Sequence, residues 1–244
     1  MSTTATGMRV AARSATGVVG TAAALQALPA LSSIAPLRHA VLPRLSGRSD
    51  RHHIALTFDD GPDRRSTPYF LDLLAQRDVT ATFFLLGAQA ARETSLVRDI
   101  AEAGHEVAVH GWTHRCLALV PPARLAAELV RTREMLEDLV GSSVRWFRPP
   151  YGVLTAAGIW SARRAGLQTV LWSAWGVDWS ASATPQTIVD RVTRAVRPGG
   201  TVLLHDTDRT SAPDSWRRTL TATATLLDRW GGAGIPVGPL REHW

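Results

Sequence analysis

The stretch LTFDDGP, Leu56–Pro62, places two neighbouring carboxylates between an apolar run and a Gly-Pro pair. Adjacent residues of a regular strand point to opposite faces of its sheet. Asp59 and Asp60 can therefore share a site only where the strand ends and the backbone turns, and Gly61 and Pro62 are typical turn residues. Two close carboxylates repel each other unless a cation lies beside them. The stretch predicts a strand end that carries a cation-binding polar site.

Six more β-rich runs follow the first run, His53–Phe58, and segments with helical spacing separate them. Pro121–Val140 is one such segment, because its leucines at 125, 129, 136 and 139 form a single apolar stripe along a helix. The six later runs are Val79–Gly87, His105–Gly111, Val144–Pro150, Gln168–Gly176, Thr201–Asp206 and Ile235–Leu240.

Seven strands and six intervening helices indicate an α/β fold. Continuous apolar strands such as Thr201–Leu204 are typical of a parallel sheet that helices cover on both faces. No GxGxxG or P-loop follows the first strand, which favours a closed or nearly closed βα barrel over an open doubly wound sheet. Since eight strands close a standard barrel, seven predict an incomplete one.

Residues whose side chains are suited to catalysis or metal binding follow most of these runs at the carboxyl ends, where parallel α/β proteins carry their active sites. They are Asp59 and Asp60 after the first run, His110 and His114 after the third, Arg148 and Tyr151 after the fourth, Asp178 and Trp179 after the fifth, and His205 and Asp206 after the sixth. His110 and His114, in HGWTH, can converge with Asp60 as a two-histidine, one-carboxylate metal set. The HxxxH pair alone would more often be two surface or capping histidines.

Five motifs carry a resemblance: TFDDGP, HGWTH, RPPYG, VDW and LLHD, in that order from about Asp50 to the C-terminus. Together they resemble the polysaccharide deacetylase family, also called the NodB-homology domain or carbohydrate esterase family 4. The resemblance implies a distorted (β/α)7 barrel. It also implies hydrolysis of the acetamide on an N-acetylated amino sugar, with release of acetate.

The resemblance also implies roles for single residues. Asp60, His110 and His114 would bind a divalent metal, usually Zn2+, with Co2+ or Mn2+ as alternatives, and Asp59 would act as general base. Arg148 would hold that base, and the backbone N–H of Tyr151 would stabilise the oxyanion. His205 would be the general acid, oriented by Asp178. Trp179 and Leu203 would line the acetyl pocket.

Two positions depart from the family pattern. The family usually has Ser or Thr after the first histidine of the metal motif and Pro after the second, whereas this chain has Gly111 and Arg115. The missing hydroxyl removes support for the metal loop, and we expect Thr113 to compensate. Asp206 is interpreted as a loop-capping carboxylate. Trp112, Trp172 and Trp175 are candidates for stacking on sugar rings, with core packing as the alternative.

The composition narrows the possible partners. The 244 residues carry a net charge of +6, and all 27 basic residues are arginines. These arginines are scattered rather than clustered among aromatic residues, so we expect no nucleic-acid partner. Cys116 is the single cysteine, which excludes an internal disulfide and a CxxC zinc site.

The N-terminal part differs from the rest of the chain. Arg9 and Arg13 precede the uncharged stretch Ser14–Leu37, which resembles a signal peptide or weak membrane anchor. We therefore expect a leader and linker over residues 1–50 and a catalytic domain over 51–244. The layout predicts a secreted or envelope-associated protein, with a cytoplasmic location as the alternative.

The sequence leaves the substrate open. Peptidoglycan, chitin oligomers, other polysaccharides and small acetylated metabolites all present the same acetamide. Hydrolysis of another small amide and a non-catalytic sugar-binding role are alternatives to N-deacetylation. The complete set of base, metal ligands and acid favours the enzyme.

Overall fold

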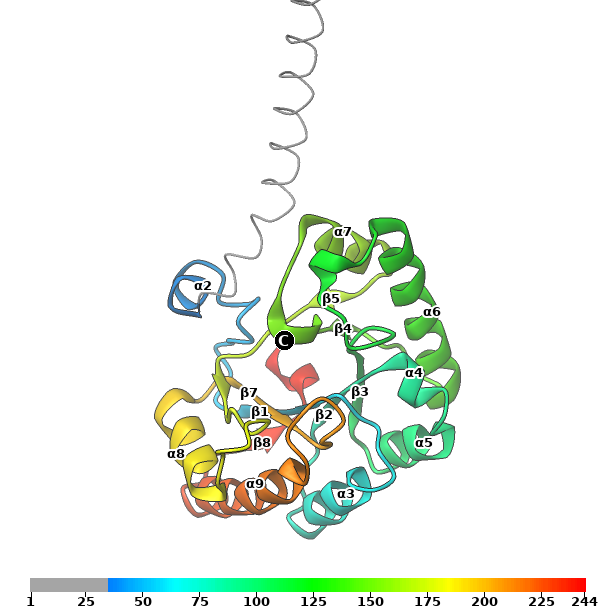
Figure 1. Cartoon of the computed structure of the whole chain (residues 1–244). Coiled ribbons are helices and arrows are strands. Elements are labelled where there is room, and N and C mark those ends of the chain that lie inside the picture. The colour runs from blue at the N-terminus through cyan, green and yellow to red at the C-terminus, as the bar shows by residue number, and fades with distance from the viewer. Residues whose placement is uncertain (1–34) are drawn as a thin grey trace, which may run out of the picture.

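The central strand of the molecule is the predicted first strand. In the computed structural model, which describes residues 35–244, it forms β1 (Ile54–Asp59) in the middle of one parallel sheet (Figure 1). The strand order is β5-β4-β3-β2-β1-β7-β6, and β8 pairs with the start of β1. The other strands are β2 (Thr82–Leu85), β3 (Glu106–Val109), β4 (Trp146–Phe147), β5 (Gln168–Thr169), β6 (Ala174–Trp175), β7 (Thr201–His205) and β8 (Val237–Gly238).

Helices surround this sheet, as Figure 1 shows. Six longer helices alternate with the strands as expected, and two short ones are added to them. They are α2 (Ala35–Val41), α3 (Thr67–Gln76), α4 (Gly87–Ala90), α5 (Thr94–Glu102), α6 (Pro122–Val140), α7 (Ala156–Arg164), α8 (Pro185–Ala195) and α9 (Ser215–Gly232). Single 3-10 turns cover Leu117–Leu119, Pro150–Gly152 and Leu240–His243. The distorted (β/α)7 barrel is confirmed.

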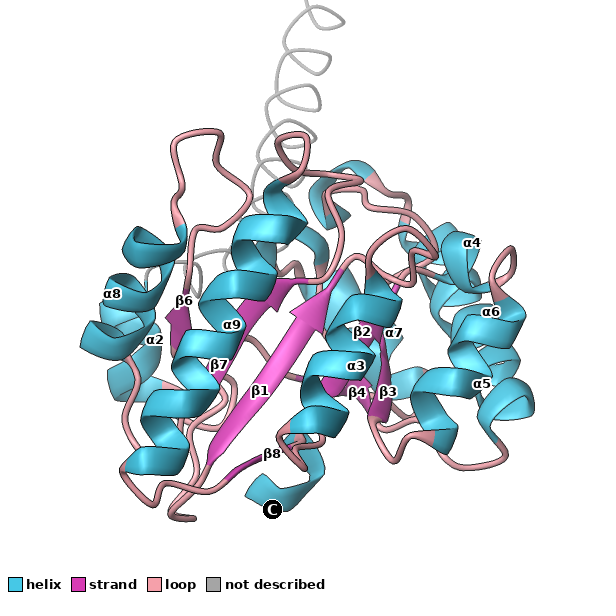
Figure 2. Ribbon diagram, turned by 90° about the horizontal axis from the view of Figure 1, so that it is seen from below, coloured by secondary structure: helices cyan, strands magenta, loops and turns pink. Residues whose placement is uncertain are grey.

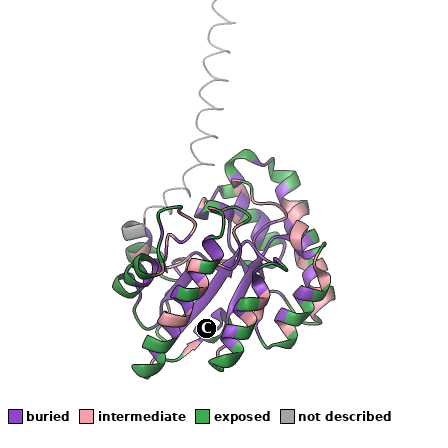
Figure 3. Ribbon diagram, turned by 60° about the horizontal axis from the view of Figure 1, so that its bottom comes forward, coloured by how far each residue is buried: buried purple, intermediate pink, exposed green. Residues whose placement is uncertain are grey.

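The core lies between the strands and the inner faces of the helices, and Figure 3 shows buried strands inside helices whose outer faces are exposed. All six residues of β1 are buried. On α6, Leu125, Leu129 and Leu136 are buried and Leu139 packs against the same core. The predicted leucine stripe is therefore the face that attaches α6 to the barrel.

One predicted strand is wrong. The run Gln168–Gly176 forms two short strands, β5 on β4 and β6 on β7, with no pairing between them. The backbone between them bonds elsewhere: the Leu171 N–H donates to Leu45 O at 2.7 Å, and Leu171 O accepts from Arg148 Nη2 at 3.0 Å. The barrel is therefore open between β5 and β6, in agreement with the predicted incomplete barrel.

The segment before β1 packs on the barrel. Arg38 donates to Trp172 O at 2.8 Å, Thr201 Oγ1 donates to Gly47 O at 2.7 Å, and the Ser49 N–H donates to Gly199 O at 2.9 Å. The domain boundary at residue 50 stays a prediction, and the leader proper, residues 1–34, lies outside the described residues. No helix within residues 35–244 combines the length and apolarity needed to cross a membrane.

The central strands β3, β2, β1 and β7 are parallel, and Figure 2 shows the arrowheads of β1 and β7 at one end of the molecule, where connecting loops gather. In the register, Asp59 lies beside both Phe84 of β2 and His205 of β7. The parallel sheet thus brings residues far apart in sequence to one edge.

Candidate active site

The two neighbouring carboxylates at the end of β1 reach the same site because the backbone turns between them. Asp60 has a φ of 78°, in the left-handed region. His110 Nε2 lies 3.8 Å from Asp59 Oδ2 and 3.2 Å from Asp60 Oδ1. A Cβ at Gly61 would lie 2.6 Å from Asp206 Oδ2, so only glycine fits the turn without a shift of that carboxylate.

Asp60, His110 and His114 form a cluster that fits a divalent metal ion. One ligand atom of each lies within 4.8 Å of the others. His110 Nδ1 lies 2.8 Å from Arg148 O, so this nitrogen carries the proton and the lone pair of Nε2 faces Asp60. Asp60 Oδ1, 3.4 Å from His114 Nε2, is buried with no hydrogen-bond partner among the described residues. An ion between these groups would satisfy that oxygen.

The charge states of the cluster suit metal ligation. Burial raises the pKa of Asp60, but the close His110 ring and the nearby His205 and His114 outweigh it, so the pKa lies well below its ordinary value. Burial lowers the pKa of His114. Both groups therefore take the forms that bind metals, a carboxylate and a neutral imidazole.

Asp59 lies beside a buried arginine instead. Arg148, 0% exposed, donates through Nη1 to Asp59 Oδ1 at 2.7 Å and to Thr57 Oγ1 at 2.8 Å. Its Nη2 donates to Leu171 O, so the guanidinium is fixed from two sides. This pairing keeps Asp59 in one orientation, with Oδ2 directed toward His110.

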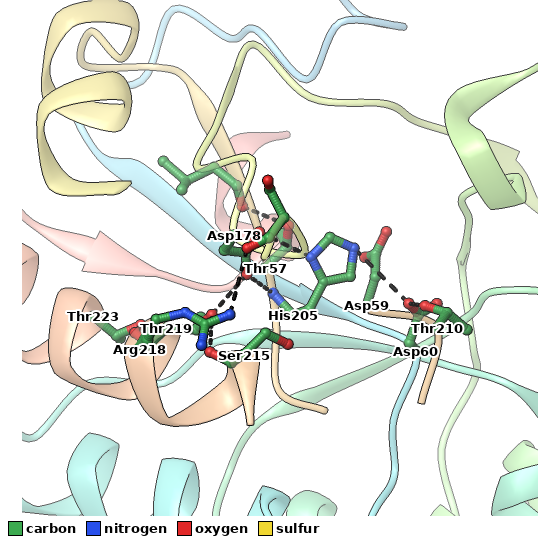
Figure 4. A network of polar contacts seen from close by, with 12 residues as sticks. Thr57, Asp59, Asp60, Asp178, His205, Thr210, Ser215, Arg218, Thr219 and Thr223 are labelled. Atoms are coloured by element: carbon green, nitrogen blue, oxygen red, sulfur yellow. Dashed lines mark hydrogen bonds and ion pairs between the residues drawn. The ribbon is translucent and has the colours of Figure 1, made fainter. Parts of the chain in front are cut away.

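His205 faces the carboxylates from the end of β7, and Figure 4 shows its ring between Asp178 and Asp60. Its Nδ1 lies 3.0 Å from Asp178 Oδ1, and its backbone N–H donates to Asp178 Oδ2 at 2.8 Å. Thr219 Oγ1 donates to the same Oδ2 at 2.9 Å. Burial lowers the pKa of His205, but the Asp178 charge and hydrogen bond outweigh it and raise the pKa to about 10. The imidazole is therefore protonated at neutral pH.

These groups line one pocket of about 220 Å³. All the predicted site residues that should touch substrate or metal border it: Asp59, Asp60, His110, His114, Tyr151, Trp179, Leu203 and His205. Arg148 and Asp178 lie behind it, each bonded to a lining residue. The structure thus brings together all ten residues to which the family resemblance gives a role.

Aromatic side chains form one wall of the pocket. Trp175 lies 4.7 Å from Trp179 and 5.7 Å from Trp172, ring centre to ring centre. Trp112 does not line the pocket, because it packs under the guanidinium of Arg131 at 3.6 Å. Tyr151, 63% exposed, stands at the mouth with its ring edge against His114. Of the three additional tryptophan candidates, two remain available to a ligand.

The structure shows the surroundings of the two positions that depart from the family pattern, Gly111 and Arg115. Gly111 has a φ of 96°, which disfavours a side chain there, and Arg115 is exposed. Thr113 does not compensate as expected, because its Oγ1 is buried and bonds to none of the described residues. Asp206 Oδ2 accepts from the Thr67 hydroxyl at the start of α3, which is a contact between side chains, and its loop-capping role stays a prediction.

The sequence missed three hydroxyl groups of the site. Thr57 and Thr219 contact Arg148 and Asp178, and Thr210 Oγ1 donates to Asp60 Oδ2. Thr57 precedes Asp59 by two residues and so points to the same face, which was a usable signal. Thr210 lies in a loop without periodicity.

The comparisons with known proteins agree with this geometry. The family model described as polysaccharide deacetylase matches residues 46–170. A chitooligosaccharide deacetylase of Bradyrhizobium sp. is 35% identical over 201 residues, 80% of this chain and 91% of the relative. A peptidoglycan-N-acetylglucosamine deacetylase of Bacillus cereus is 38% identical over 162 residues, 66% of this chain and only 58% of that protein.

Solved structures share the fold. The Bc1960 peptidoglycan N-acetylglucosamine deacetylase, in complex with an N-oxidanyl-benzamide, has a TM-score of 0.74 and 31% identity over 82% of this chain and 91% of its own. A carbohydrate esterase family 4 pseudoenzyme from Bacillus anthracis has a TM-score of 0.71 and 28% identity, over 80% of this chain and 66% of its own. With its five motifs, its barrel and these matches, the chain belongs to the polysaccharide deacetylase family.

Proposed function

We propose that this chain is a metal-dependent hydrolase that removes N-acetyl groups from N-acetylated amino sugars and releases acetate. The observation that carries the proposal is the meeting of three units in one pocket. These units are the Asp60 metal cluster, the Asp59 carboxylate held by Arg148 and the protonated His205 held by Asp178. A pocket with a metal site, a base and an acid has what amide hydrolysis requires.

The metal ligands in this proposal are Asp60, His110 and His114. The nitrogen and oxygen donors favour Zn2+, with Co2+ or Mn2+ as alternatives. When bound, such an ion supplies Lewis-acid chemistry, which lowers the pKa of water and polarises a carbonyl. The orphaned Oδ1 of Asp60 supports this assignment.

The acid and base roles follow from the surroundings of each group. Asp59 accepts a proton from the attacking water, and Arg148 keeps it in place without covering Oδ2. His205 donates a proton to the leaving nitrogen, because Asp178 keeps the imidazole protonated. The backbone N–H of Tyr151 is the proposed oxyanion donor, a kind of group that contributes about 3 to 4 kcal/mol.

The acetyl group would lie between Trp179 and Leu203, which border the pocket beside His205. The half-buried Trp172 and the exposed Trp175 continue this wall and suit the apolar face of a sugar ring. Two relatives named as peptidoglycan and chitooligosaccharide deacetylases support an N-acetylated glycan as substrate.

We place the activity at the cell envelope or outside the cell. The peptidoglycan deacetylase among the relatives and the apolar stretch Ser14–Leu37 support this location. The same stretch is proposed to give weak membrane association, and the catalytic domain is proposed to cover residues 51–244.

A substrate panel tests the proposal. The metal-loaded chain is assayed for acetate with N-acetylglucosamine oligomers and peptidoglycan, and for product with a formamide, a cyclic imide and a small acetylated metabolite. Acetate from the glycans alone supports the proposal, and hydrolysis of a non-sugar amide alone contradicts it. His110→Ala, which removes a metal ligand, should be inactive in every case. If the wild-type chain binds glycan but hydrolyses nothing, the sugar-binding alternative replaces the enzyme.

A further inference from the structure

A threonine outside the five motifs contacts the proposed metal cluster. Thr210 follows β7 in the loop 207–214, and its Oγ1 donates to Asp60 Oδ2 (Figure 4). Thr210 also lines the pocket. The hydroxyl therefore reaches the carboxylate from the loop after β7, and not from the HGWTH loop after β3.

The two oxygens of Asp60 differ in their hydrogen bonding. Oδ2 accepts from Thr210, whereas Oδ1 lies 3.2 Å from His110 Nε2 and 3.4 Å from His114 Nε2 and has no hydrogen bond. A carboxylate can rotate about its terminal bond, because this torsion is broad. A hydroxyl on one oxygen limits that rotation and keeps the other oxygen directed at the two histidines.

The loop that carries Thr210 is held at several points. Thr207 Oγ1 donates to Asp63 Oδ2 at 2.9 Å, and Arg209 Nε lies 3.2 Å from the same oxygen. Farther along, the Asp214 N–H donates to Asp208 Oδ2 at 2.8 Å. The loops after β1 and β7 are thus tied together, which fixes Thr210 relative to Asp60.

We propose that Thr210 is a positioning residue that orients Asp60 for metal binding and takes over the support missing at Gly111. Gly111 has no side chain, and the Thr113 hydroxyl has no partner among the described residues. The supporting hydroxyl comes instead from the loop after β7. This inference rests on the proposed function, since it assumes that Asp60, His110 and His114 hold the ion.

Zinc affinity of the metal-free full chain tests the inference without any assay of turnover. The wild type, Thr210→Val and Thr210→Ser are titrated with Zn2+ against a chelator of known affinity, at a temperature where circular dichroism shows all of them folded. Valine keeps the shape but removes the hydroxyl. We expect Thr210→Val to bind about 10- to 100-fold more weakly, the usual effect of losing such a partner, and Thr210→Ser to bind within a few-fold of wild type.

Thr221→Val is the matched control, since Thr221 is exposed on α9 and its side chain bonds to the carbonyl of Arg217 within the same helix. Its affinity should equal that of wild type. Equal affinity of Thr210→Val and wild type would overturn the role of Thr210 and leave the metal site intact. Equal losses in Thr210→Val and Thr210→Ser would also overturn it, because the hydroxyl would then not be the cause. A wild-type chain that binds no Zn2+ would overturn the proposed metal site itself.

Discussion

Asp59 and Asp60 are neighbours in the chain but have different surroundings. Asp60 faces His110 and His114, and its pKa lies well below the ordinary value. Asp59 is bonded to Arg148, which is completely buried. The two carboxylates are therefore suited to different roles. Asp60 is suited to hold an ion, and Asp59 is suited to take a proton.

Asp59→Asn tests this division. The amide keeps the shape of the side chain but cannot accept a proton, so we expect turnover to fall by about 10²- to 10⁴-fold, the usual contribution of a general base. Metal content should stay at the wild-type level, since Asp59 is not a proposed ligand. Acetate release and metal analysis of the same preparation check both points. Near-normal turnover would rule out Asp59 as the base.

The Asp178–His205 pair predicts a pH effect. Asp178 holds the pKa of His205 at about 10, against the effect of burial, so the acid form persists to alkaline pH. Activity should be lost as the pH rises through the pKa of His205. In Asp178→Asn the pKa falls, and the alkaline limb of kcat/KM should move down by about 1 to 3 pH units.

The control for this profile is Asp72→Asn, an exposed change on α3 that removes the same charge far from the site. Its pH profile should match wild type. An alkaline limb that does not move in Asp178→Asn would mean that another group sets it.

At the scale of elements, β1 and α6 illustrate which parts of the fold are visible in the sequence. β1 is a continuous apolar run that ends in Asp59, and every one of its residues is buried. Pro122–Val140 has a leucine stripe that fits one helix face, and the helix begins one residue after the predicted start. Both elements follow from local periodicity, so both are predictable.

Leu129→Ala tests the packing of α6. Leu129 is 0% exposed in the main core, so the change should lower the free energy of unfolding by about 2 to 5 kcal/mol. Val130→Ala, at the more exposed neighbouring position on the same helix, should change it by about 0.5 kcal/mol or less. Urea unfolding of both variants checks the contrast. Equal effects would show that the leucine stripe does not attach the helix.

Other features depend on distant residues and have no local signal. The run Gln168–Gly176 divides because Leu171 bonds to Leu45 and Arg148, which lie far from it in the chain. Thr210 reaches Asp60 across 150 positions, from a loop with no pattern. The motif residues at strand ends were predictable, because a parallel sheet collects its carboxyl ends at one edge. Of the hydroxyls that support them, Thr57 had a local signal, because it lies two residues before Asp59 on β1, whereas Thr210 had none.

At the scale of the whole molecule, the two ends of the barrel differ. The carboxyl end holds the pocket, and near the start of β1 the buried His53 and His243 pack together with their Nδ1 atoms 3.3 Å apart. His243 Nε2 lies 3.1 Å from Thr201 Oγ1, which joins the C-terminal turn to β7. Glu242 and Arg51 face His53 from outside. Among the described residues, none of the proposed catalytic groups lies at this end.

The histidine pair predicts acid sensitivity. Burial lowers the pKa of His243 to about 4, and also lowers the pKa of His53. Between about pH 6.5 and 4 the unfolded chain binds more protons than the folded one, so the free energy of unfolding falls as the pH falls. His243 alone should contribute a loss on the order of 2 kcal/mol by pH 5.

Urea unfolding at pH 7 and pH 5 measures this loss. His243→Gln should show a smaller difference between the two pH values than wild type, whereas the exposed His52→Gln should show the same difference as wild type. A His243→Gln variant with the full wild-type difference would assign the acid sensitivity to other groups.

Metal-dependent deacetylation is the central claim, and one measurement tests it most directly. The chain is stripped with a chelator, and acetate release from N-acetylglucosamine oligomers is followed with and without added Zn2+, Co2+ or Mn2+, together with total metal content. The Asp60, His110 and His114 cluster predicts no release from the stripped chain and recovery with about one ion per chain. Full activity without metal, or one bound ion with no acetate, would contradict the account.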